Sequence, residues 1–312
     1  MQFEQVSRRI ATPFAFRALV KPGFHLQMLC VAVVILTITV IGCQVIAVHV
    51  PDAENLFLPV GLMAVVACAM CLYLKERGWV RTADSVLTIL WGVFFYVVLN
   101  FPVTIAARLG MGNALYDSSF LRLDGMLGVS VPAIASWFSR HGMEGLMSSV
   151  YSALIPLLWS AILLPTLTGR AWLAQRFMAA NLVAFALGLP LFALFPAVGP
   201  WYGFHLVARP DEAACQALLE LIRTPGIYTY HLPAGIICFP SFHVIWAILG
   251  AYALWGFRWM RVPVAMLATA IVVSTLATGV HYLVDVIGGI VLASISIAVV
   301  MQTKHASKPA SV

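Results

Sequence analysis

Charged residues are scarce in this chain of 312 residues, since only 10% are Asp, Glu, Lys or Arg. A soluble domain carries about 25% charged residues, so the composition excludes an ordinary soluble globular protein. Hydrophobic residues make up 62% of the chain, and the mean hydropathy is +0.96. No basic cluster lies in a polar domain that could carry nucleic acid. The sequence therefore predicts an all-α integral membrane protein of one compact domain, without a nucleic-acid partner.

Cysteine is also scarce, with six residues in the chain. Four lie in apolar runs, and the Cys68-x-x-Cys71 pair among them has no second pair, which favours packing over a metal or redox site. Cys215 and Cys238 instead lie in one predicted outer connection. In an oxidising compartment they could form a disulfide, and the sequence leaves open whether they pair.

Long apolar runs predict about eight transmembrane helices. They are expected near residues 26–50, 56–74, 86–106, 150–168, 177–197, 242–257, 262–280 and 282–302. Most of the 18 Lys and Arg fall at the two ends of the chain and in alternate loops, so both termini are predicted to be cytoplasmic. Most histidines fall on the opposite side. We therefore expect any chemistry on the extracytoplasmic face of a bacterial inner or plasma membrane.

Two outer connections are longer than simple links between spans. Residues 107–149 include an amphipathic stretch, Val131 to Leu146, that is predicted to form one interfacial helix. Residues 199–238 open on Pro200-Trp201-Tyr202. Both connections are too apolar and aromatic for disorder. We expect them to form a lid and a wall around a headgroup pocket.

The first chemically informative motif is Pro240-Ser241-Phe242-His243. Proline and serine directly before an apolar run mark a helix start, with Ser241 as the N-cap. Free N–H groups at such an end attract phosphate, and His243 would lie beside it. Taken alone, an ordinary cap with an interfacial histidine explains this motif better.

The second motif is His281-Tyr282-Leu283-Val284-Asp285. Asp285 is the only acid deep in a predicted span, where a carboxylate costs roughly 2.5–3.5 kcal/mol. His281 lies one helical turn before it, on the same face. A hydrogen bond from one ring nitrogen to Asp285 would leave the other as a free lone pair. A structural pair that only joins helices explains the motif equally well.

The two motifs are separated by a predicted hairpin of spans, 242–257 and 262–280. A hairpin returns the chain to the same face, so His243 and His281 are expected to meet. Together the motifs favour phosphoryl transfer through a histidine nucleophile over two unrelated structural roles.

This arrangement resembles the type 2 phosphatidic acid phosphatase superfamily of lipid phosphatases and phosphotransferases. The family's Pro-Ser-Gly-His element is similar to residues 240–243, with Phe242 in place of glycine. Its Ser-Arg-x5-His-x3-Asp element is similar to residues 274–285, with Thr275 in place of arginine. Its Lys-x6-Arg-Pro element is matched only at Arg209-Pro210, with Tyr202 in place of lysine. Two phosphate-binding cations of the family are thus missing.

A divergent branch that includes inositol phosphorylceramide synthase is similar in these departures. Its Phe-Pro-Ser-x-His, His-Tyr-x-x-Asp and Pro-Trp-Tyr elements are all present here. Arg223 resembles an arginine found before the histidine motif in bacterial members, so the resemblance favours Arg223 over Arg209 as the main phosphate clamp. It also implies a six-helix catalytic core at residues 86–303, after a basic segment and two extra spans at 1–85 and before a short tail at 304–312.

The mechanism implied by the resemblance needs no metal and no cofactor. His281 would attack the phosphorus of a lipid phosphate, Asp285 would orient it, and His243 would serve as acid and then base. The phosphate oxygens would be held by Arg223, Arg209 and Ser241, and the pocket would be lined by Trp201, Tyr202, Phe242 and Tyr282. Water, or a hydroxyl acceptor such as a polyol or lipid, would then receive the phosphoryl group.

Three other readings compete with this one. A metal hydrolase would use His243, His281 and Asp285 as ligands, but no second acid is at hand to activate water. A proton-coupled transporter would suit eight spans and a membrane acid, but no relay leads to the cytoplasmic side. A serine hydrolase based on Ser241 is the least favoured, because Ser241 and His243 would point apart.

Overall fold

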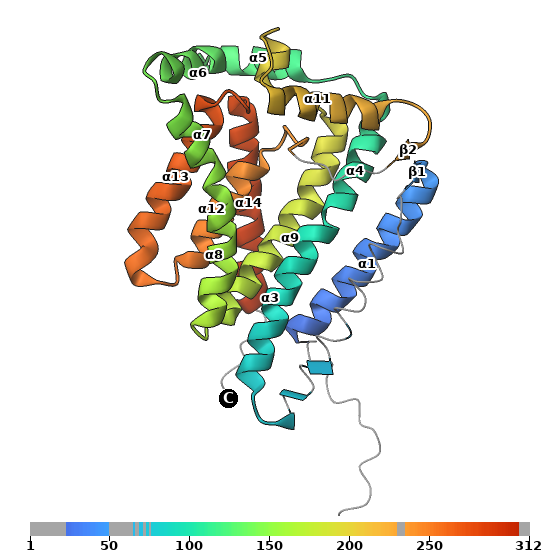
Figure 1. Cartoon of the computed structure of the whole chain (residues 1–312), viewed down its shortest axis with the longest axis vertical. Coiled ribbons are helices and arrows are strands. Elements are labelled where there is room, and N and C mark those ends of the chain that lie inside the picture. Colours follow the sequence, from blue (N-terminus) through green and yellow to red (C-terminus); the bar gives the residue numbers. More distant parts are fainter. Residues whose placement is uncertain are drawn as a thin grey trace, which may run out of the picture.

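The computed structural model describes residues 23–49, 65, 69–70, 73–74, 76–229 and 235–305. Within these residues the protein is an all-α helical bundle, as predicted (Figure 1). The predicted span at 56–74 lies largely outside them, as do Cys68 and Cys71.

The helices fall into two groups. The bundle contains α1 (Phe24–Val45), α3 (Val80–Val98), α4 (Asn100–Leu109), α7 (Glu144–Ser152), α8 (Leu154–Leu167), α9 (Ala171–Leu194), α12 (Phe242–Leu254), α13 (Arg261–Ala277) and α14 (Leu283–His305). Across one end lie α5 (Asp117–Met126), α6 (Val131–Arg140) and α11 (Pro210–Arg223), which we call the cap layer (Figure 1). Short elements are η1 (Gly110–Gly112), α10 (Pro200–Gly203), η2 (Arg258–Met260), β1 (Val48–His49) and β2 (Tyr228–Thr229). The two strands pair in parallel, with Val48 opposite Tyr228.

Six helical stretches of the described chain are long and apolar enough to cross a membrane. They are Phe24–Val45, Val80–Gly112, Glu144–Leu167, Ala171–Leu194, Arg258–Ala277 and Leu283–Gln302. The predicted span at 242–257 corresponds to α12, an apolar helix of 13 residues. These helices establish an integral membrane fold, and the count of eight stays a prediction.

The predicted interfacial helix from Val131 to Leu146 is wrong as a single element. The structure divides it into α6 and α7, which are separated by a turn at residues 141–143. Gly142 adopts a φ of +68° in this turn, in the left-handed region that favours glycine. As a result the chain leaves the cap layer after α6, and α7 enters the bundle directly above α8 (Figure 1).

Helix α12 lies at the centre of the bundle and packs against α8, α9, α13 and α14. Its first turn approaches α14 closely at Gly289, where an added Cβ would lie 2.8 Å from the Ser241 carbonyl oxygen and 2.9 Å from Val244 Cβ. Small residues permit such close contacts between membrane helices. This approach sets the start of α12 against the start of α14, and so brings the two sequence motifs to the same end of the bundle.

Candidate active site

His243 and His281 meet beneath the cap layer. Their ring centroids are 5.9 Å apart and their planes are inclined by 53°. His281 is buried, whereas His243, the second residue of α12, is partly exposed. The prediction that the helical hairpin brings the two imidazoles together is therefore confirmed.

The His281 ring is fixed through its Nδ1 atom. This nitrogen lies 3.1 Å from the carbonyl oxygen of Cys238 and 3.4 Å from Oδ2 of Asp285. A carbonyl oxygen can only accept, so Nδ1 carries the proton and Nε2 is left with its lone pair. The nearest partner of His281 Nδ1 is therefore the Cys238 carbonyl, whereas the sequence predicted Asp285. Helix α14 begins at Leu283, so His281 precedes it and does not share its face with Asp285.

Asp285 is fully buried and stabilises the first turn of α14. Its Oδ2 accepts the Tyr282 backbone N–H at 2.8 Å and the Cys238 thiol at 3.1 Å. Its Oδ1 has no hydrogen-bond partner within the described chain. Burial, and then the Asp285 charge, raise the pKa of Cys238, which keeps this thiol protonated as a donor.

Two further observations concern Cys215 and Cys238. No disulfide joins Cys215 and Cys238, the pairing that the sequence left open. Ligand atoms of Cys238, His281 and Asp285 lie within 4.8 Å of one another, a donor set that could hold a metal ion. The imidazole donor on that side would be Nδ1, which faces Cys238 and Asp285, so Nε2 would stay free.

His243 is held by Tyr151 of α7. The two rings stack with centroids 3.9 Å apart and planes 20° apart, and the phenol oxygen lies 3.1 Å from His243 Nδ1. Since Nδ1 is engaged, Nε2 of His243 is the nitrogen available for proton transfer. Sequence reasoning missed Tyr151, because no motif surrounds it and its position depends on the turn between α6 and α7.

Ser241 is the N-cap of α12, as predicted. Its hydroxyl accepts the Val244 N–H at 3.4 Å, and its own N–H donates to the Asp285 carbonyl at 3.1 Å. The residue is fully buried. The hydroxyl therefore caps α12, and the N–H joins the start of α12 to the start of α14.

The two arginines predicted to bind phosphate lie in different surroundings. Arg209 donates to the carbonyl of Thr278, three residues before His281, at 3.0 Å and pairs with Glu212 at 2.7 Å. About a third of its side chain is exposed, at 32%. Arg209 is thus tied to the segment that carries the histidine pair.

Arg223 instead binds backbone carbonyls at the end of α4. Its guanidinium donates to the backbone carbonyls of Gly110 at 2.6 Å and Asn113 at 2.5 Å, and more weakly to Met111. Partial burial lowers the pKa of Arg223. Its contacts join α11 to the end of α4 and do not include the histidine pair. The preference for Arg223 over Arg209 has no support in this geometry.

The four residues expected to line the pocket also lie in different surroundings. Phe242 packs on Phe185 and Trp246, with ring centroids at 4.7 and 5.5 Å, so it belongs to the bundle core. Tyr282 is fully buried, and its hydroxyl lies 3.0 Å from the Gly199 carbonyl. Trp201 is buried and Tyr202 is 37% exposed, both on α10.

Two buried acids of the cap layer were also missed. Asp124 accepts the N–H groups of Leu283 at 2.8 Å and Val284 at 3.0 Å, and so caps α14 from outside. Asp117 accepts the Val198 and Gly199 N–H groups and contacts the Tyr282 hydroxyl. Burial raises the pKa of both carboxyls, against the hydrogen bonds that favour their charged forms. Neither acid belongs to a recognisable motif, so only the tertiary structure identifies these contacts.

Fold and site together define an all-α membrane protein with a pair of imidazoles at the capped end of its helical bundle. A family model of the PAP2 superfamily matches residues 118–299, which is more than half of the chain and includes both histidine motifs. The chain belongs to this superfamily, whose members are generally phosphatases or phosphotransferases. No curated protein and no solved structure matches it.

Proposed function

We propose that this protein is a lipid phosphate phosphatase or phosphotransferase that works through a phosphohistidine on His281. The proposal rests on one observation: two imidazoles lie 5.9 Å apart, and His281 is fixed through Nδ1. Its Nε2 is then the free nucleophilic atom. The superfamily supports the reaction class, and the lipid substrate and histidine intermediate are our inference.

In the first step, Nε2 of His281 attacks phosphorus and the bond to the leaving oxygen breaks. His243 gives a proton from Nε2 to that oxygen, so the leaving group departs as an alcohol. In the second step, His243 takes the proton of an incoming hydroxyl, which attacks phosphorus and releases His281. Asp285, 3.4 Å from Nδ1, stabilises the cationic ring between the two steps.

Tyr151 keeps His243 ready for both proton transfers. With the phenol at Nδ1 and the ring stacked on its face, the imidazole can neither flip nor turn away without losing both contacts. Tyr151 is therefore a positioning residue in this scheme. Its side chain acts through His243 and not on the phosphate.

Charge compensation falls to Arg209. Tyr202 and Thr275 stand where the family pattern has its other cations, so a single guanidinium must hold most of the phosphate charge. Arg209 is anchored at Thr278 yet partly exposed, which leaves donors for a ligand. We assign Arg223 a structural role instead. No metal or cofactor is required in this scheme.

The acceptor is water for a phosphatase and a polyol or lipid hydroxyl for a transferase. Asp124 of the cap layer accepts the Leu283 N–H at the start of α14, two residues after His281, and Trp201 on α10 is buried. Such a cap protects a phosphoenzyme from hydrolysis and favours transfer. This agrees with the resemblance to the inositol phosphorylceramide synthase branch. The distribution of Lys and Arg supports an extracytoplasmic site and cytoplasmic termini. The family resemblance implies the catalytic core at residues 86–303.

Incubation of the purified protein with phosphate-labelled lipids tests this function. Released inorganic phosphate indicates hydrolysis, and label on an added polyol or lipid alcohol indicates transfer. Phosphatidic acid and an inositol phospholipid with ceramide as acceptor are suitable probes. His281→Ala should abolish either product in protein that keeps its thermal stability. Labelled product from folded His281→Ala would overturn the covalent route.

A further inference from the structure

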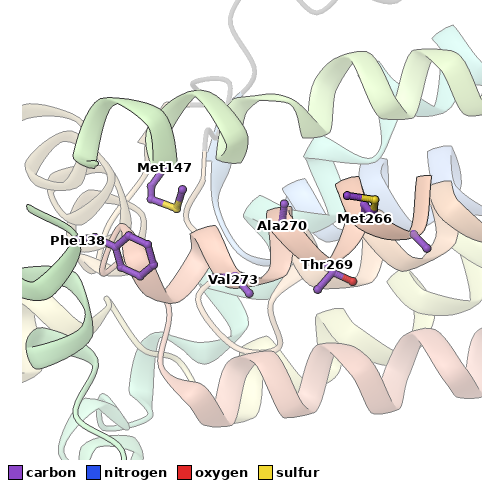
Figure 2. A pocket seen from close by; sticks show the side chains of 7 residues that line it. Phe138, Met147, Met266, Thr269, Ala270 and Val273 are labelled. Carbon is purple, nitrogen blue, oxygen red and sulfur yellow. The ribbon is translucent and has the colours of Figure 1, made fainter. Parts of the chain in front are cut away.

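An apolar groove of about 490 Å³ runs along α13, between it and α7, and ends below α6 (Figure 2). Phe138 of α6 and Met147 of α7 form one side, and one face of α13 from Ala265 to Val273 forms the other. None of the lining side chains is charged. At 1.5 Å per residue, the α13 face is about 12 Å long, which is enough for part of an extended acyl chain.

The surroundings of this groove are the lipid bilayer. Its long wall, α13, belongs to the membrane-spanning stretch Arg258–Ala277. Met266 and Val273 of the groove are themselves 68% and 45% exposed, so the groove opens laterally. The Thr269 hydroxyl is the one polar side-chain group of the lining, and no lining side chain could pair with a charged ligand. An alkyl chain is the chemistry that these side chains fit.

Both walls of the groove lead to the histidine pair. Tyr151 follows Met147 by four residues on α7, which places both side chains on one face of that helix, and Tyr151 stacks on His243. On the other wall, Val273 lies five residues before Thr278, whose carbonyl holds Arg209. His281 follows three residues later. The Val273 end of the groove is therefore the end nearest the proposed chemistry.

We propose that this groove holds an acyl chain of the lipid substrate, with its phosphoester at His243 and His281. The inference rests on the proposed function and adds where the substrate's tail lies. A substrate tail is favoured over bulk lipid or a partner helix because both lining helices also contact the site, α7 through Tyr151 and the end of α13 through Thr278. The substrate is accordingly an amphiphile that enters sideways from the outer leaflet, between α7 and α13.

Groove-filling substitutions test the idea. Ala270→Trp and Val273→Trp place an indole in the groove, and Val262→Trp is the matched control on the same helix, at a 68% exposed position outside the lining. The probes are dioleoyl and dibutyryl phosphatidic acid, which share a headgroup and differ in tail length. We expect kcat/KM for the long-chain probe to fall about ten-fold or more in both groove variants, because several methylenes lose their contact. The short-chain probe and Val262→Trp should stay within about two-fold of wild type.

A binding measurement separates this inference from the proposed function. Phosphatidic acid with a photoreactive diazirine near the chain end should crosslink to residues 265–273 and to Met147. Excess phosphatidylcholine should not compete, and Ala270→Trp should abolish the crosslink. Unchanged long-chain kinetics in the groove variants, or crosslinks that phosphatidylcholine removes, would overturn the groove assignment. Absent turnover of either probe with a retained crosslink would overturn the enzymatic proposal and leave the groove assignment standing.

Discussion

Tyr151 lies flat against His243, with ring centroids 3.9 Å apart and planes inclined by 20°. The phenol oxygen is also 3.1 Å from His243 Nδ1. Stacking and the polar contact together fix one imidazole of a pair whose other member is fixed by the Cys238 carbonyl. Each ring thus has Nδ1 engaged and Nε2 available, which is the arrangement required for in-line attack by His281 and proton transfer by His243.

Removing the two Tyr151 contacts separately should produce graded losses. Tyr151→Phe keeps the stack and loses the hydroxyl, and a hydrogen bond of about 1 kcal/mol predicts a roughly five-fold lower kcat. Tyr151→Ala also loses a stack worth about 0.5–1.5 kcal/mol, which predicts up to another ten-fold. Steady-state kinetics over pH should show KM nearly constant. Tyr96→Phe, at an exposed tyrosine of α3, is the control. Equal activity of all three variants would contradict the positioning role.

Arg209 and Arg223 should separate into a chemical and a structural residue. Arg209→Gln removes the only guanidinium tied to Thr278 among the described residues and should lower kcat about 100-fold. The loss of its contacts with Thr278 and buried Glu212 should also cost about 1–3 kcal/mol of unfolding free energy. Arg223→Gln leaves the carbonyls of Gly110 and Asn113 without their donor and should cost about 1–3 kcal/mol of unfolding free energy with kcat retained. Circular dichroism melts and kinetics on the same samples check both. The reverse pattern would restore Arg223 as the phosphate clamp.

Asp124→Asn should destabilise the start of α14. Each carboxylate oxygen accepts one N–H, from Leu283 and from Val284, and an amide would turn its NH₂ group toward one of these donors. The loss of one charge-assisted bond predicts about 1–3 kcal/mol of destabilisation. A lower melting temperature and faster amide exchange at residues 283–286 would show it. Glu220→Gln, on the exposed face of α11, should melt like wild type.

Chelation should leave turnover unchanged. The scheme uses an arginine and two imidazoles, although Cys238, His281 and Asp285 form a donor set within 4.8 Å. Dialysis against EDTA followed by assay, with metal content measured before and after, checks this. Activity that is lost with the metal and restored by zinc would instead favour a metal-dependent hydrolase.

The meeting of His243 and His281 could be predicted because it depends only on chain topology. Two apolar helices in sequence must return the chain to its starting face, whatever their packing. The Ser241 cap was equally accessible, since capping depends on local sequence and its neighbours. Both predictions needed only the order of apolar and polar residues.

The partners of these residues could not be predicted in the same way. Tyr151 reaches His243 only because the chain turns at Gly142 and sends α7 into the bundle. The Cys238 carbonyl carries no side-chain signal at all, yet it lies nearer to His281 than Asp285 does. The choice between Arg209 and Arg223 depends on which carbonyls each guanidinium meets, and that is a tertiary property.

The most direct measurement is the site of covalent phosphorylation. His243→Ala should accumulate phosphoenzyme from an aryl phosphate, because this leaving group needs no acid while breakdown still needs the missing base. Mass spectrometry under alkaline conditions, where phosphohistidine survives, should place the phosphate on His281 and find none in the His243→Ala/His281→Ala double variant. Phosphate on a different residue, or turnover without any phosphoenzyme when His281 is absent, would contradict the account.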